Sequence, residues 1–217
     1  MAIPIFSEQL NFVVETAFTI LAVIFCFLIY IKTKESYELT KYEGIKYFRD
    51  AFLFFGLSYL LRFIFSLIFL SRIAFDFILP RKIFIPLFIL PLGYFSTISI
   101  LYLVFSLIWK KVNNKILLIG GHSIAILLTL ISVITRSHLM LIYLQSFLLT
   151  VTIVWSFLIH SKKLSQTKIL YILVFVLWLI NLIILGNRHH SLFEILAMII
   201  SIAVFIKIYS KVSKRIK

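Results

Sequence analysis

The sequence predicts an all-α, polytopic membrane protein: a bundle of seven transmembrane helices, with the N-terminus outside and the C-terminus in the cytoplasm. Three observations lead to this class. Of the 217 residues, 62% are hydrophobic and only 14% are charged, whereas a soluble domain has about 25% charged residues. The apolar residues gather in runs of about 20, the length that crosses the hydrocarbon core of a bilayer. Lysine and arginine concentrate in alternate gaps between these runs, as in membrane proteins of fixed orientation.

Seven apolar runs follow one another along residues 1–217, which we expect to form a single transmembrane domain. They cover approximately residues 11–31, 51–70, 83–109, 116–135, 139–160, 169–186 and 192–210. The third run contains Pro86, Pro91 and Gly93, which predicts a bend or an irregular start there. The other runs contain no proline, which disfavours the paired broken helices of many secondary transporters.

The basic residues in the gaps determine the predicted orientation. Sixteen of them fall in the gaps at residues 32–50, 110–115 and 162–168 and at the C-terminal end, and five fall in the gaps on the other side. The richer side is predicted to be cytoplasmic. We therefore assign the net charge of +14 to orientation in a cell membrane, with the lipid bilayer as partner, and expect no nucleic-acid partner.

The gap from Lys32 to Asp50 mixes basic residues with Glu35, Glu38 and Glu43. We expect a solvated charged loop here. A helical extension, or a docking surface for a cytoplasmic or membrane protein partner, is the alternative.

Arg62 lies near the middle of the second apolar run. A guanidinium stays protonated in proteins, and placing it at the centre of a bilayer costs at least about 2.5–3.5 kcal/mol. Arg62 must therefore face protein or water, and it needs an acidic partner. Glu15 and Glu194, each about one turn inside its run, are the candidates.

Other strongly polar residues fall on the interior faces that helical spacing predicts. Gln145 and Asn181 lie about 10 Å from the outer ends of their runs, and Arg62 about 14 Å from the outer end of its run. These depths predict one polar layer in the outer half of the membrane, which is either a ligand-binding pocket or a buried cluster that only clamps the helices. Its predicted members are Arg62, Glu15, Glu194, Asn181, Gln145 and Tyr59.

We predict no catalytic, metal or cofactor site. The histidines fall at different levels without the spacing of metal ligands; they are His122, His138, His160, His189 and His190. Cys26 has no histidine at its level, and no acid lies in the inner half of any run. The sequence therefore indicates a protein that is not an enzyme.

One segment carries a family resemblance. Residues 44–63, GIKYFRDAFLFFGLSYLLRF, combine an aromatic helix start with Ser-Tyr-x-x-Arg at Ser58, Tyr59 and Arg62. With the helix and charged gap before it, this first third of the chain resembles the seven-helix sensory module that precedes the kinase or cyclase domain of many prokaryotic signalling proteins. The resemblance implies a sensor. Because the chain ends at Lys217 without an effector domain, its output is expected to pass through another protein.

These observations favour a receptor-like or sensory membrane protein that binds a small or lipidic ligand in the outer-half pocket and acts through a partner. A small transporter or channel is the first alternative, and it requires a water path through the inner half. A structural subunit of a membrane complex is the second, in which the polar residues only specify helix packing.

Overall fold

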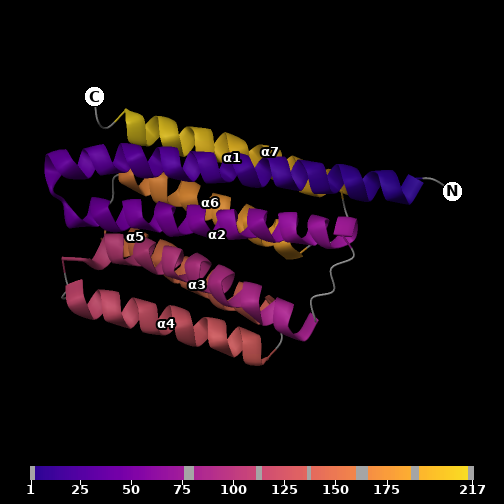
Figure 1. The fold of residues 1–217 in the computed structure, drawn as a ribbon. Coiled ribbons are helices and arrows are strands. Elements are labelled where there is room, and N and C mark those ends of the chain that lie inside the picture. Colours follow the sequence, from indigo (N-terminus) through magenta and orange to yellow (C-terminus); the bar gives the residue numbers. More distant parts are fainter. Residues whose placement is uncertain are drawn as a thin grey trace.

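A computed structural model describes the backbone of residues 3–75, 81–110, 114–135, 138–159, 166–186 and 191–214. Side chains are described over residues 13–68, 86, 88–110, 115–135, 140–154, 169–180 and 195–214. Within these ranges the chain forms seven α-helices (Figure 1): α1 (Ile3–Thr40), α2 (Glu43–Phe75), α3 (Arg81–Ile108), α4 (Asn114–Ile134), α5 (His138–Ile159), α6 (Gln166–Gly186) and α7 (Ser191–Ser213). The predicted all-α class is confirmed.

Five helices of the described part have the length and hydropathy of membrane spans, within Val13–Thr40, Glu43–Ile68, Phe88–Ile108, Lys115–Ile134 and Ile195–Ser213. The apolar stretches described in α5 and α6 are shorter, Met140–Val154 and Ile169–Ile180. Large apolar side chains such as Ile119 and Ile134 are 70% and 78% exposed, a surface suited to lipid. These features are those of a multi-pass membrane protein; the number of spans and their orientation stay predictions.

The segment from Lys32 to Asp50, which we expected to be a loop, is instead almost wholly helical. α1 ends at Thr40 and α2 begins at Glu43, so a two-residue turn joins the helices. Lys41 in this turn has a φ of 53°, the left-handed conformation that follows many helix ends. Residues 32–50 are named the hairpin segment below.

Charge pairing explains why the hairpin segment is helical. Lys32 Nζ lies 2.8 Å from Glu35 Oε2, and Lys46 Nζ lies 3.2 Å from Glu43 Oε2. Pairs at this spacing each stabilise a helix by about 0.2–0.5 kcal/mol. Glu43 also lies in the first turn of α2, where a carboxylate interacts favourably with the helix dipole. The mixed charges that we interpreted as a loop are therefore helix-stabilising pairs.

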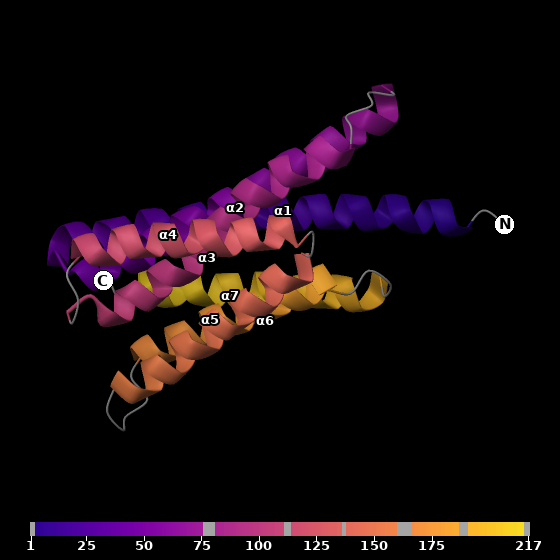
Figure 2. The same cartoon turned by 90° about the horizontal axis from the view of Figure 1, so that it is seen from below.

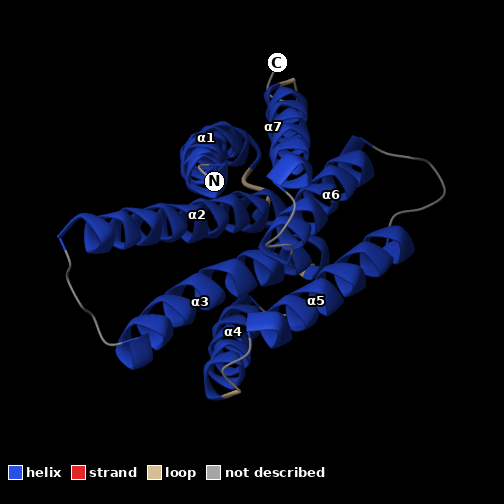
Figure 3. Cartoon of the chain, turned by 90° about the vertical axis from the view of Figure 1, so that its right-hand side faces the viewer, coloured by secondary structure: helices blue, strands red, loops and turns tan. Residues whose placement is uncertain are grey.

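The helices form two layers. α1, α2, α3 and α4 lie side by side in chain order, and α5, α6 and α7 form the second layer (Figures 1 and 3). α2 packs between α1 and α3. The layers are joined where α1 contacts α7 and where α3 and α4 contact α5. α3 passes through Pro86 and Pro91 as one continuous helix.

Aromatic side chains fill the space between the layers. Phe205 of α7 is 0% exposed. Its ring centroid lies 5.9 Å from that of Phe25 on α1 and 6.2 Å from that of Phe55 on α2. The Phe55 ring also lies 4.5 Å from Trp178 on α6. Four helices from both layers therefore meet around Phe55 and Phe205.

Gly121 marks a close approach of α4 to α3. A Cβ atom at Gly121 would lie 2.6 Å from ring carbons of Phe105, whereas a Cβ atom at Gly120 would meet nothing within 4 Å. We expect Gly121→Ala to lower the free energy of unfolding by about 1–3 kcal/mol through overpacking. Gly120→Ala, the matched control, should raise it by up to about 1 kcal/mol because alanine favours a helix. Unfolding in mixed detergent micelles measures both values, and equal effects would contradict the close packing.

Candidate functional site

An ion pair joins Glu15 of α1 to Arg62 of α2. Glu15 Oε1 accepts hydrogen bonds from Arg62 Nη2 at 2.5 Å and from Arg62 Nε at 3.2 Å. The Arg62 side chain is 18% exposed and the Glu15 side chain is 40% exposed. Of the two acids predicted as partners of Arg62, the structure places Glu15 beside it.

The hydroxyls one turn from Glu15 and Arg62 donate to backbone carbonyls and not to the two charged groups. Thr19 Oγ1 donates to the Glu15 carbonyl at 2.7 Å, and Ser66 Oγ donates to the Arg62 carbonyl at 3.1 Å. Both hydroxyls thus bond within their own helices. Tyr59, one turn before Arg62, is 4% exposed and packs edge-on against Phe18 at 6.0 Å between ring centroids. The Phe18 and Tyr59 rings therefore pack together between α1 and α2, one turn from the ion pair.

Ring contacts between α2 and α3 show which residues of α3 lie at the same height along the bundle as Arg62. The ring centroids of Phe65 and Phe88 are 4.1 Å apart, and those of Phe54 and Phe95 are 6.0 Å apart. From the first of these ring pairs to the second, the residue number falls on α2 and rises on α3. The two helices are therefore antiparallel. Arg62, one turn before Phe65, is then level with about residues 90 and 91 of α3, at 3.6 residues per turn.

Two other helices end close to this level. A Cβ atom on Gly93 of α3 would lie 2.9 Å from Thr129 on α4 and 3.2 Å from Leu141 on α5. α5 begins one turn before Leu141, and α4 ends five residues after Thr129. α1 and α2 extend past these ends (Figure 2). Arg62 therefore lies level with the ends of α4 and α5.

Gln145 does not share this level, which corrects the predicted single polar layer. It is 4% exposed, and its Nε2 donates to Ser96 Oγ at 2.7 Å and to Thr97 Oγ1 at 3.1 Å. One turn further along α3, Ser99 Oγ donates to the Ala51 carbonyl at 2.7 Å. Gln145 is thus at least one turn further into the bundle than Arg62. The predicted depths of Arg62 and Gln145 were counted from the outer ends of their own apolar runs. These ends are not at one level, because α2 continues to Phe75, well past the start of α5.

The side chains of Asn181 and Glu194 lie outside the described residues. Their membership of the site stays a prediction, as does the site's role in ligand binding. Tyr59 is placed next to Arg62 along α2.

The hairpin segment carries a second charged cluster at the opposite end of α1 and α2. Arg49 Nη2 lies 2.7 Å from Asp50 Oδ1. The Arg49 guanidinium also lies 5.4 Å from the ring centroid of Tyr30 and 5.5 Å from that of Tyr37. Tyr37 Oη in turn donates to Glu43 Oε1 at 3.1 Å. Charged contacts therefore connect α1 to α2 at both ends of the pair.

A polar group that sequence reasoning missed lies between α3 and α4. Tyr94 Oη is 2.7 Å from His122 Nδ1, and Tyr102 Oη is 3.4 Å from His122 Nε2. Phe54 of α2 contacts the edge of this group, 6.5 Å from the His122 ring centroid. The signal was present in the sequence: two tyrosines eight residues apart share a helix face, next to a helix that carries a histidine.

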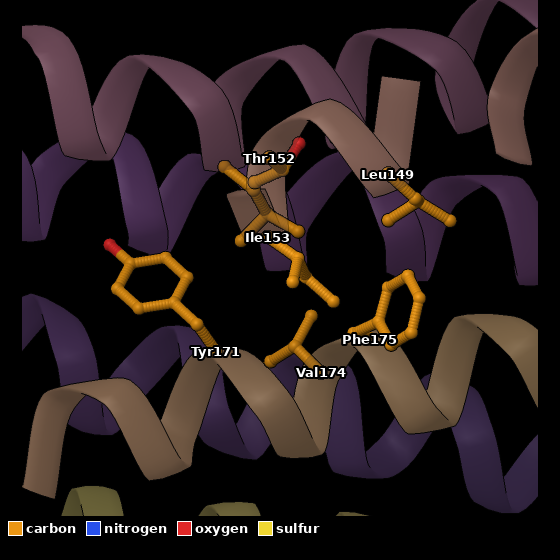
Figure 4. A pocket seen from close by; sticks show the side chains of 7 residues that line it. Leu149, Thr152, Ile153, Tyr171, Val174 and Phe175 are labelled. Atoms are coloured by element: carbon orange, nitrogen blue, oxygen red, sulfur yellow. The ribbon is translucent and has the colours of Figure 1, made fainter. Parts of the chain in front are cut away.

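A small cavity of about 10 Å³ lies between α3, α5 and α6. Leu149 and Thr152 of α5 face Val174 and Phe175 of α6 across it (Figure 4). This volume is about that of one water-sized sphere, which is too small for the predicted ligand. Thr152 Oγ1 donates to the Leu148 carbonyl at 2.8 Å, so its hydroxyl is bonded within α5.

The described side chains contain no cluster of three His, Cys, Asp or Glu that could hold a metal ion. The absence of a cofactor stays a prediction.

The fold and the charged pair define a helical, multi-pass membrane protein. Over 209 residues the chain is 29% identical to a protein of Archaeoglobus fulgidus described as an uncharacterized protein, and the alignment covers 93% of this chain and 92% of that protein. No family model matches the sequence, and no solved structure matches it. The chain is thus similar to an archaeal protein along nearly its whole length.

Proposed function

We propose that the protein is a receptor-like membrane protein that binds an anionic small or lipidic ligand at Arg62 and acts through a partner at the hairpin segment. One observation carries the proposal: a partly exposed ion pair joins the same two helices that form the hairpin. With the orientation that the basic residues predict, Arg62 faces the outside and the hairpin faces the cytoplasm.

The geometry at Arg62 favours an anionic ligand. A guanidinium binds a carboxylate or phosphate best through two parallel hydrogen bonds to two oxygens, but both bonds described for Arg62 go to the single oxygen Oε1 of Glu15. A ligand with two anionic oxygens offers the better arrangement. Exposed apolar side chains on the same two helices, such as Val13 and Ile64 at 61% and 40%, suit contact with lipid.

Continuous helices connect the ligand site to the hairpin segment. α1 has 38 residues and α2 has 33, and both run without interruption between the ion pair and the turn. A ligand that takes Glu15's place releases α1 from α2 at one end, while Arg49 still connects them at the other. The ligand shifts the arrangement of the two helices only by its preference for one of their states.

Palmitate, with its uncharged methyl ester as matched control, tests the ligand chemistry. In detergent-purified protein we expect palmitate to raise the melting temperature by a few degrees and methyl palmitate to leave it unchanged. Glu15→Gln should strengthen the palmitate effect, because a competing carboxylate is removed. Arg62→Gln should abolish it.

Other outcomes would favour the alternatives. Equal shifts from palmitate and its ester, or an unchanged shift in Arg62→Gln, would contradict the proposal and favour a structural subunit. Solute flux into liposomes that hold the purified protein would favour a transporter or channel.

A further inference from the structure

We propose that Tyr94, His122 and Tyr102 form a proton-transfer site inside the bundle, a role separate from ligand binding at Arg62. Both ring nitrogens of His122 face a tyrosine hydroxyl, Nδ1 at 2.7 Å and Nε2 at 3.4 Å. The hydroxyls come from two levels of α3, and the eight residues between them span about 12 Å along the helix. The imidazole therefore bridges two depths in the bundle.

Two hydroxyls around one imidazole satisfy every protonation state of the ring. A tyrosine hydroxyl both donates and accepts hydrogen bonds, and a neutral imidazole has one donor and one acceptor nitrogen. Either neutral tautomer therefore finds a donor for its bare nitrogen and an acceptor for its N–H. The imidazolium finds two acceptors. A purely structural histidine also uses a partner at each nitrogen. What two hydroxyls add is that both neutral tautomers, and the imidazolium between them, keep both hydrogen bonds.

The transfer step needs only a hydronium ion on one side of the site and a water molecule on the other. Tyr102 Oη gives its proton to the bare Nε2 of His122 and takes another from the hydronium ion, so the ring becomes an imidazolium. Nδ1 then gives its proton to Tyr94 Oη, whose own proton passes to the water molecule, and the opposite neutral tautomer is left. Each hydroxyl oxygen has formed one bond to hydrogen and broken one, while the ring has gained a proton at Nε2 and lost one at Nδ1. The same steps in reverse return the proton and restore the first tautomer.

The neighbouring titratable groups lie on the hairpin side of Tyr102. The Tyr47 ring of α2 packs edge-on against Tyr102 at 5.7 Å between centroids, and the Asp50 carboxyl is close enough to interact with Tyr102 electrostatically. Asp50 itself pairs with Arg49 at 2.7 Å. On α4 the nearest described basic residue is Lys115, two turns before His122. These groups place the proposed proton donor at the hairpin end of the bundle.

Exchange of the His122 ring protons with D₂O tests the site. Nitrogen NMR of protein labelled at histidine follows these protons, and the resonance is assigned by its loss in His122→Gln. We expect exchange to slow by about 100-fold in Tyr102→Phe, the scale of a positioned acid–base group. Tyr94→Phe should shift the tautomer population in the direction opposite to Tyr102→Phe, because each variant removes the partner of a different nitrogen.

Tyr143→Phe is the matched control, since Tyr143 of α5 is 71% exposed; its exchange rate should equal that of the unmodified protein. The Tyr→Phe variants keep the Tyr102 ring against Phe54 and Phe105 and the Tyr94 ring against Phe95, so folding is preserved. An exchange rate that neither Tyr94→Phe nor Tyr102→Phe alters would overturn the proposal.

Discussion

Replacing Phe205 with alanine is expected to lower the free energy of unfolding by about 3–5 kcal/mol, the range for a large side chain removed from a packed core. Phe205 is 0% exposed and stacks on Phe25 of α1 while contacting Phe55 of α2. Because the surrounding side chains belong to helices of both layers, the cavity closes only if whole helices move. Equilibrium unfolding in mixed detergent micelles, followed by tertiary fluorescence, measures the loss.

Phe147→Ala is the control for this prediction. Phe147 of α5 is 66% exposed, so its substitution should change the stability by less than about 0.5 kcal/mol. Similar losses in the two variants would show that Phe205 does not occupy the space between the layers.

Reversing the charge at Arg62 is expected to cost about 2–3 kcal/mol in Arg62→Glu. The substitution removes the ion pair and places a second carboxylate beside Glu15. Breaking a fully buried pair costs about 3–5 kcal/mol, but the Glu15 side chain is 40% exposed, and solvent screening weakens the effect. The same unfolding experiment in micelles of neutral detergent measures it.

The swapped variant, Glu15→Arg with Arg62→Glu, should recover most of this loss because it restores opposite charges at the same contact. Lys34→Glu provides a surface comparison: Lys34 and Glu38 are 54% and 58% exposed and 3.8 Å apart, so that variant should lose less than about 0.5 kcal/mol. A swapped variant as unstable as Arg62→Glu would show that the ion pair is not the interaction that Arg62 contributes.

Much of the fold could be predicted from hydropathy, because a membrane helix must satisfy its own backbone hydrogen bonds and present apolar side chains along its length. The third run, predicted at residues 83–109, forms α3 from Arg81 to Ile108. The fourth, predicted at 116–135, forms α4 from Asn114 to Ile134. These boundaries agree to within two residues because apolar composition changes sharply there.

Hydropathy failed where a helix leaves the apolar region. α1 and α2 continue through the hairpin segment, where charged pairs such as Lys32 and Glu35 sustain the helix. A charged helix and a charged loop have similar composition, and only the spacing of opposite charges distinguishes them. The expected loop was therefore wrong for a reason that the sequence contains.

The site could be predicted only in part. The need of Arg62 for an acid follows from electrostatics alone, and Glu15 was one of two acids near the correct level. The depth of Gln145 relative to Arg62 depends on how far α2 extends past the start of α5. The length of each apolar run, taken alone, does not show this. Metal-ligand spacing does not single out His122, because its partners are the hydroxyls of Tyr94 and Tyr102.

The proposed function requires that the Arg62–Glu15 pair and the hairpin segment are coupled through α1 and α2. Hydrogen–deuterium exchange of residues 32–50 in lipid nanodiscs tests it most directly. We expect faster exchange of this segment in Arg62→Glu than in the unmodified protein, and a return to the original rate in the swapped variant. Identical exchange in all three proteins, with the ion pair broken only in Arg62→Glu, would contradict the coupling.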